Sequence, residues 1–218
     1  MFVRDYMTRH PVMVESTMST VEAQGIMAET RTRHVPVVGD GKRLSGLLTR
    51  DRFSIPPTRL TSLNVWEITR FLSNMRVEDI MVKSRDVVTT GPDATIEEAA
   101  RLMASHKIGC LPVLDHDGVV IGMLTDVDML DQLADLLGAK AEGVRVTVRV
   151  PDRKGEFAKI TAAIAERNWG IYASGGVPTP RMPGYWDIVL KVRDVEAEEL
   201  VPVLEAIEGQ QVIDVRKM

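Results

Sequence analysis

Apolar positions in this chain recur with two periods, and the change from one period to the other predicts its elements. In 96–103 they fall at i, i+3, i+4 and i+7, which is one face of an amphipathic helix. The apolar runs 111–114 and 119–124 flank an Asp-Gly pair, a sequence typical of a β-hairpin. A β-branched run at 87–89 predicts a strand before that helix, and a closing helix is expected to end at Gly138, a residue suited to a C-cap.

The same pattern occurs twice in the chain. Residues 33–38 and 46–49 match residues 109–114 and 122–125 position by position, always 76 residues apart. Each copy therefore predicts the order strand, helix, strand, strand, helix. A repeat of this length is a supersecondary unit that buries its apolar face against its copy, and the cleft between two such copies is a place for a ligand.

The chain outside the copies predicts two further parts. A capping-box sequence at Asn64 and Glu67 begins a linking helix. Beyond Gly138, elements follow in the order strand, helix, strand, strand, helix, strand, the ferredoxin-like split βαβ arrangement. The predicted fold is α+β or α/β, with two β-α-β-β-α units before a small α+β domain. The predicted segments are 1–60 (first copy), 61–76 (linking helix), 77–137 (second copy) and 143–218 (C-terminal domain).

Composition narrows the classes of function. With 44% hydrophobic and 27% charged residues among 218, the chain has enough apolar material for a sizeable core. A net charge of -4 disfavours nucleic acid as a partner, and no apolar run reaches the ~18 residues that span a membrane. The start lacks a signal-peptide core and only one cysteine is present, which favours the cytoplasm. No metal-ligand spacing, P-loop or nucleophile–base pair is visible, so neither a metal site nor an enzyme is expected.

The sharpest chemical signal follows the second hairpin, in the run from Gly122 to Asp128. Gly122 lets a ligand approach the backbone, and Thr125 lies where a strand ends and a helix begins. The Thr125 hydroxyl and the free N–H groups of the helix can hold a phosphate, and Asp128 can accept hydrogen bonds from a ribose. The other interpretation makes Thr125 an N-cap and Asp128 a first-turn acid that stabilises the helix dipole. On the motif alone, the capping interpretation is favoured.

The doubled Pro-Val strand followed by Gly-x-x-Thr resembles a pair of CBS domains, the arrangement called a Bateman module. The run 151–157, Pro-Asp-Arg-Lys-Gly-Glu-Phe, resembles the first turn of an ACT domain. The order CBS-CBS-ACT, with the segments 108–113 and 136–139, resembles the acetoin-utilisation AcuB family. The resemblance covers nearly the whole chain.

This resemblance implies an adenosine-containing ligand, such as AMP, ADP or ATP, in the cleft between the repeats. It assigns Thr125 to the phosphate and Asp128 to the ribose. The backbone and apolar contacts to adenine are then expected from Val87, Val88, Ile108, Gly109, Cys110, Leu111 and Pro112.

The first copy departs from the pattern, because Arg52 occupies the position that corresponds to Asp128. Asp51 lies one residue early, and a helix turns about 100° per residue, so its side chain is expected to point elsewhere. Arg33, His34 and Arg52 either form an anion-binding corner or are solvated surface charges. The altered site comprises Arg33, His34, Val35, Pro36, Thr49, Asp51 and Arg52.

The ACT resemblance implies a site for a small ligand, often an amino acid, in the first turn at Asp152, Gly155, Glu156 and Phe157. The alternative is a plain capped turn with Phe157 in the core. The domain then serves dimerisation, for which an edge strand offers unpaired backbone groups.

Together these observations predict a non-catalytic regulatory protein for which an adenine nucleotide is a regulatory ligand and not a cofactor. The resemblance implies a homodimer, a regulated enzyme partner and a setting in acetoin or carbon catabolism. The alternative is a structural interaction subunit with a vestigial nucleotide site and ACT-mediated assembly, which the altered first copy favours.

Overall fold

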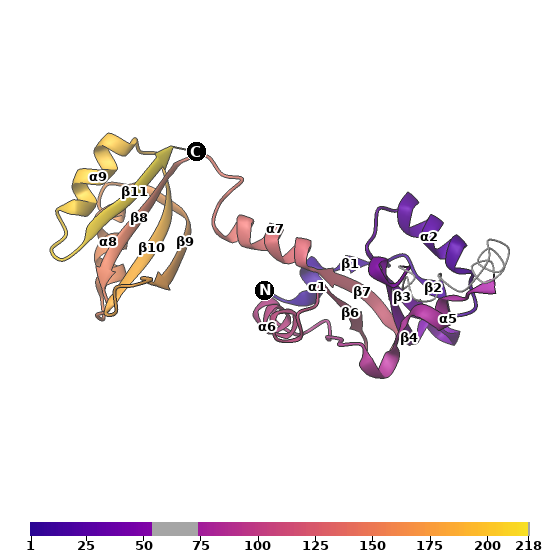
Figure 1. Ribbon diagram of the computed structural model, residues 1–218. Coiled ribbons are helices and arrows are strands. Elements are labelled where there is room, and N and C mark those ends of the chain that lie inside the picture. The colour runs from indigo at the N-terminus through magenta and orange to yellow at the C-terminus, as the bar shows by residue number, and fades with distance from the viewer. Residues whose placement is uncertain (54–73, 218) are drawn as a thin grey trace, which may run out of the picture. The chain divides into compact units, whose positions relative to one another are not determined.

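The computed structural model describes residues 1–53 and 74–217. The chain divides into two compact units, Met1–Met129 and Leu130–Met218, and the first unit holds the first copy and the second copy as far as residue 129 (Figure 1). The predicted linking helix over 61–76 falls almost wholly outside the described residues. The boundary lies earlier than the expected end of the second copy at residue 137. A reason is visible at Gly175 of the C-terminal unit, where an added Cβ would lie 3.4 Å from Leu137 Cδ2.

Each copy contains a helix followed by an antiparallel hairpin, as the apolar pattern predicted. The first copy has α2 (Thr20–Glu29), β3 (His34–Val38), η1 (Asp40–Lys42), β4 (Leu44–Thr49) and η2 (Arg50–Phe53); the second has η3 (Ser84–Asp86), α6 (Ile96–His106), β6 (Cys110–Leu114), β7 (Val120–Thr125) and α7 (Asp126–Leu136). Helix α6 begins with a capping box, because Thr95 and Glu98 exchange side-chain and backbone hydrogen bonds. Gly138 follows α7 with φ 70°, as expected for a helix-terminating glycine.

The opening segments of the two copies are exchanged. Strand β1 (Thr8–Arg9), from the first copy, pairs with β7 of the second copy, and β5 (Val82–Lys83), from the second, pairs with β4 of the first. Val3 of α1 (Val3–Tyr6) is buried in the core of the second copy. Val77 of α5 (Val77–Ile80) is buried in the core of the first copy. The exchange joins the two copies into one unit and sets the start of each beside the end of the other.

Sheet order follows from this exchange. Among the described residues, one sheet has the order β2-β3-β4-β5 and the other β1-β7-β6, with β2 (Val14–Glu15) parallel to β3. The strand predicted at 87–89 does not form. The chain leaves η3 at that point, and only Thr90 reaches the sheet, where its N–H donates to Pro112 O at 3.1 Å.

Two corresponding glycines make room for the exchanged segments. A Cβ built on Gly46 would lie 2.5 Å from Val82 O, and one on Gly122 would collide with Met7 Sδ. The sequence had predicted that a ligand approaches the backbone at Gly122. The structure gives that space to the segment around Met7 instead, so Gly122 serves the packing of the two copies.

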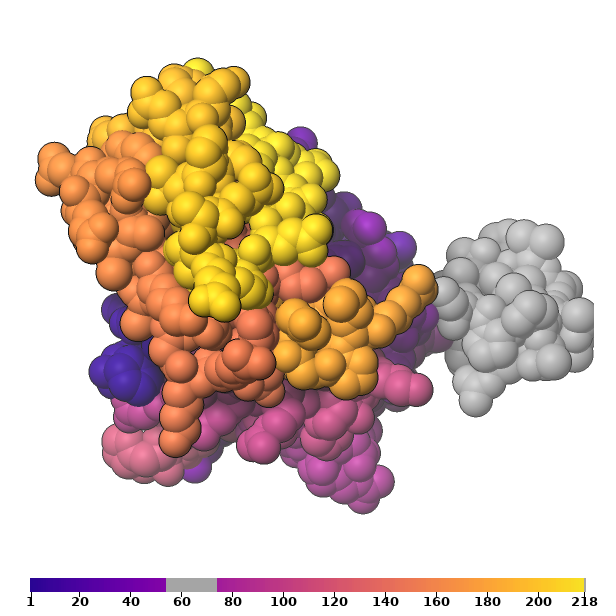
Figure 2. Space-filling model, turned by 90° about the vertical axis from the view of Figure 1, so that its left-hand side faces the viewer, coloured from indigo at the N-terminus to yellow at the C-terminus, as the bar shows by residue number. Residues whose placement is uncertain are grey.

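The C-terminal unit has the predicted order of elements, and its helices cover one face of a four-stranded antiparallel sheet (Figure 1). Its elements are β8 (Val144–Pro151), α8 (Glu156–Ala165), β9 (Gly170–Pro178), β10 (Tyr185–Arg193), α9 (Ala197–Glu205) and β11 (Gln211–Lys217), with the sheet order β11-β8-β10-β9. Val146 and Leu190 from the sheet pack with Ile160, Leu200 and other helix residues in one core. Helix α9 and β11, in yellow, lie at the face seen in Figure 2. None of the described helices is both long enough and apolar enough to cross a membrane.

Candidate functional site

A cavity of about 350 Å³ lies where the two copies meet. Its walls come from the segment after β1, the turn between α2 and β3, and the end of β7 with the start of α7. The lining residues are Thr8, His10, Pro11, Val12, Thr30, Arg31, Thr32, Arg33, His34, Met123, Thr125 and Val127. Because β1 pairs with β7, the exchange is what brings the start of the first copy beside Thr125. A volume of this size suits a small organic ligand.

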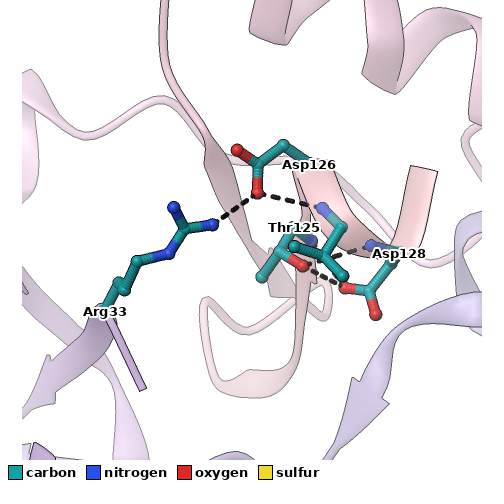
Figure 3. Close-up of polar contacts among 5 residues, drawn as sticks. Arg33, Thr125, Asp126 and Asp128 are labelled. Atoms are coloured by element: carbon teal, nitrogen blue, oxygen red, sulfur yellow. Dashed lines mark hydrogen bonds and ion pairs between the residues drawn. The ribbon is translucent and has the colours of Figure 1, made fainter. Parts of the chain in front are cut away.

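Thr125 and Asp128 cap helix α7 reciprocally (Figure 3). The Thr125 N–H and hydroxyl both donate to Asp128 Oδ2 at 2.7 Å, and the Asp128 N–H donates to Thr125 Oγ1 at 3.3 Å. This is the capping interpretation of the motif. Thr125 lines the cavity, whereas Asp128 is not among the lining residues, and its contact to a ribose stays a prediction.

The start of α7 does not offer the free N–H groups that the sequence predicted for a phosphate. The Asp126 N–H donates to Gly109 O at 2.9 Å, and the Val127 N–H donates to Asp126 Oδ1 at 2.9 Å. The next N–H, that of Asp128, is taken by Thr125. These internal partners satisfy the groups that a helix start would otherwise present to an anion. Internal partners therefore occupy the N–H groups of this helix terminus, and a phosphate bound there stays a prediction.

An ion pair crosses the seam beside this helix start. Arg33 Nη2 of the first copy lies 3.0 Å from Asp126 Oδ1 of the second copy, and the two side chains are 53% and 46% exposed. Figure 3 shows the Asp126 carboxylate turned toward Arg33 and away from Asp128. His34 follows Arg33 in the chain and also lines the cavity. The cavity wall thus carries the guanidinium of Arg33 and the imidazole of His34 from the first copy.

His34 is expected to make folding pH-dependent. Burial lowers its pKa below the usual 6.5, and Arg33 adds to the effect, whereas Asp126 and Asp51 oppose it. The folded protein therefore binds fewer protons than the unfolded chain as the pH falls through 6.5, so the free energy of unfolding decreases toward acid pH. Denaturant titrations between pH 8 and pH 5 should show a shallower decrease for His34→Gln than for the wild type. The exposed His116, replaced in the same way, serves as the control, and identical slopes for His34→Gln and wild type would contradict the assignment.

Two of the residues expected to contact adenine lie directly beside Thr125, because Cys110 is its partner in the β6–β7 ladder and Gly109 O accepts the Asp126 N–H. Cys110 and Leu111 are buried within β6, and Val87 packs in a small cluster with Cys110. Burial raises the pKa of the Cys110 thiol to about 12, which suits a core residue and not a reactive one. The seven residues are not among those that line the Thr125 cavity, and their contact to adenine stays a prediction: Val87, Val88, Ile108, Gly109, Cys110, Leu111 and Pro112.

The structure brings only some residues of the altered first site to the Thr125 cavity. Arg33 and His34 line the Thr125 cavity, whereas Arg52 does not. Asp51 turns back to its own copy, where the Thr49 hydroxyl donates to Asp51 Oδ1 at 2.5 Å and lowers the pKa of that carboxyl. The remaining two members, Val35 and Pro36, are buried in β3. The proposed anion-binding corner therefore lacks Arg52 and gains Thr125.

In the turn before α8, the buried side chain is the carboxylate of Glu156, whereas the capped-turn interpretation of the sequence placed Phe157 in the core. Glu156 is 5% exposed, while Phe157 is 45% exposed. Gln210 Nε2 donates to Glu156 Oε2 at 2.9 Å, and Lys159 Nζ pairs with Glu156 Oε1 at 2.7 Å. The Lys159 contact lowers the pKa of the Glu156 carboxyl, with a further contribution from Gln210. Placing Phe157 in the core was wrong. Gly155 adopts φ 92° before α8, and Asp152 is exposed.

Sequence reasoning missed the cavity wall formed by 8–12 and 30–32. The one available signal was the match of Val3, Asp5 and Met7 to equivalent residues that open the second copy. That match marks the exchanged segments, but it does not reveal that they change places. Among the described residues, no group of three or more His, Cys, Asp or Glu side chains is placed to hold a metal ion.

Two copies joined by exchanged segments define a tandem-repeat module with a cavity where the copies meet. The sequence model of the CBS domain family matches residues 3–53 and 77–135, half of the chain. The chain therefore belongs to the CBS domain family, and it contains a CBS pair.

Two solved structures show the same architecture. The chain is 31% identical to a Vibrio cholerae protein assigned to acetoin utilization (AcuB), over 64% of this chain and 95% of that one, with a TM-score of 0.52. It is 25% identical to CBSX2 in complex with AMP, over 62% of this chain and 96% of that one, with a TM-score of 0.52.

Among curated relatives, the chain is 35% identical over 130 residues to a homoserine O-acetyltransferase of Methanohalobium evestigatum. That match covers 59% of this chain and 23% of the relative. The chain thus spans less than a quarter of the length of this enzyme.

Proposed function

We propose that this protein is a non-catalytic regulator that binds an adenosine-containing ligand, such as AMP, ADP or ATP, at the seam of its CBS pair. The observation that carries the proposal is the cavity in which Thr125 of the second copy meets Arg33 and His34 of the first. The AMP complex of CBSX2 supports this choice of ligand. A ligand that prefers one packing of the two copies would shift their populations, which is how binding regulates.

A structural interaction subunit is the second candidate. Its support is the capping box of α7, which accounts for Thr125 and Asp128 without any ligand. On this account the cavity is vestigial, and a partner protein captured by the full chain is bound equally well with and without nucleotide.

We also propose that the C-terminal unit is an ACT domain and that the protein is a homodimer with an enzyme partner in acetoin or carbon catabolism. The order of elements in the unit supports the ACT assignment, and the likeness to the Vibrio cholerae protein supports the setting in acetoin catabolism. Four exposed leucines in α7 and just after its end support the dimer, because three of them are spaced i, i+3 and i+7, and apolar side chains with this spacing suit a helix interface. They are Leu130, Leu133, Leu136 and Leu137. The turn at Asp152, Gly155, Glu156 and Phe157 is the proposed ACT ligand site.

The test is calorimetric titration of AMP, ADP, ATP, S-adenosylmethionine and NADH into the full chain. At least one is expected to bind at or below millimolar concentration. Asp128→Ala is expected to weaken binding by about tenfold, because Thr125 loses the partner that orients it and the ribose loses an acceptor.

The control separates this loss from the loss of a helix cap. Glu98→Ala removes the equivalent capping box of α6, which does not line the cavity, at a similar cost of about 1 kcal/mol in stability. Its affinity should equal that of the wild type. The proposal fails if no ligand binds at millimolar concentration, or if Asp128→Ala binds as tightly as the wild type.

A further inference from the structure

The cavity is cationic on one side. Of the residues that line it, four can carry positive charge and none is acidic: His10, Arg31, Arg33 and His34. The corresponding positions of the second copy for the last two are Gly109 and Cys110, which carry no such charge. The asymmetry between the copies therefore places the Arg33 guanidinium at the Thr125 cavity, where it favours an anionic ligand.

Arg33 is held in this cavity by a contact that is easily replaced. The pair with Asp126 is made through one guanidinium nitrogen, Nη2, and both side chains are about half exposed. Exposed ion pairs of this kind contribute little to stability. A phosphate, in contrast, binds a guanidinium through two parallel N–H donors, in a stronger and more directional contact.

Asp126 is also fixed independently of Arg33. Its Oδ1 accepts the Val127 N–H at 2.9 Å, and its backbone N–H donates to Gly109 O. The carboxylate therefore keeps its place at the start of α7 whether or not Arg33 is paired with it. A negative charge that stays beside the guanidinium competes with any anion that enters the cavity.

We propose that Asp126 competes with the phosphate of the bound ligand for Arg33, so that a phosphorylated adenosine ligand replaces an ion pair between the two copies. The proposal rests on the proposed function, which it deepens: Arg33 selects phosphorylated ligands over neutral adenosine, and Asp126 sets how tightly they bind. Ligand entry breaks a contact across the seam, which couples occupancy to the packing of the copies.

The experiment compares AMP with adenosine by calorimetry, in the full chain and three variants. Asp126→Asn keeps the acceptor for the Val127 N–H and removes the competing charge, so AMP should bind about two- to fivefold tighter. Arg33→Gln should weaken AMP by about ten- to a hundredfold. Adenosine should bind equally well to both variants and to the wild type. Asp93→Asn breaks the exposed pair of Arg4 with Asp93, which also joins the two copies but lies outside the cavity lining, and should leave AMP affinity unchanged.

The outcomes are distinguishable. If Asp126→Asn binds AMP as the wild type does, or more weakly, the competition is overturned while the proposed function stands. If adenosine and AMP bind equally well and Arg33→Gln changes neither, the selection by Arg33 is overturned in the same way. If neither ligand binds the wild type, the inference is overturned and no AMP or adenosine site exists at the seam.

Discussion

Gly46→Ala is expected to lower the free energy of unfolding of the N-terminal unit by about 1–3 kcal/mol. The new Cβ would lie 2.5 Å from Val82 O and 2.6 Å from Met81 Sδ. Val82 O belongs to the backbone of β5, which pairs with β4 at this point, so relief requires a shift of the exchanged strand. Urea denaturation followed by circular dichroism measures the change.

Alanine variants of two further glycines provide a comparison for the cost of Gly46→Ala. Gly122→Ala meets Met7 Sδ, the end of a flexible side chain, and Thr8 O only at 3.2 Å, so its cost should be smaller. Gly25→Ala lies within α2 with nothing within 4 Å of the new Cβ and should stabilise the protein by up to about 1 kcal/mol. If Gly46→Ala proved as stable as the wild type, the close packing of β5 against β4 would be wrong.

Lys191→Met is expected to raise the free energy of unfolding of the C-terminal unit by about 1–3 kcal/mol. Lys191 is 1% exposed on the face of β10 opposite to the core, and its Nζ has no hydrogen-bond partner among the described residues. The turn after α7 covers it, since an added Cβ at Gly138 would lie 3.5 Å from Lys191 Cβ. Methionine keeps the length of the side chain and removes the unpaired ammonium group.

Urea denaturation followed by tryptophan fluorescence is suited to this test, because Trp169 and Trp186 pack against the core of the same unit. Lys154→Met, at an exposed position of the same unit, removes the same charge and should change stability by less than about 0.5 kcal/mol. A Lys191→Met variant that is less stable than the wild type would mean that the ammonium contributes favourably to the fold.

The fold could be predicted from the sequence where local pattern decides it. The amphipathic face of α6 and the Asp-Gly hairpin are local features, and both were predicted correctly. The prediction of a strand at 87–89 was wrong. β-branched residues favour a strand only where a neighbouring strand is available, and in this segment only Thr90 reaches one.

The site could be predicted only in part, because the exchange of β1 and β5 is a long-range event. Thr125 and Arg33 were both selected from the sequence, yet they were assigned to different sites. Nothing in the local pattern around Thr125 shows that the first copy supplies the facing wall. Similarly, the burial of Glu156 in place of Phe157 depends on Gln210, which is far away in the sequence.

The central claim is that an adenosine ligand binds at the seam of the CBS pair, and a crystal structure of the full chain with millimolar AMP tests it most directly. The account predicts AMP between residues 8–12, residues 30–34 and Thr125, with its phosphate on the Arg33 guanidinium and Asp126 released from Arg33. AMP bound at another place in the chain, or an empty seam cavity at that concentration, would contradict it.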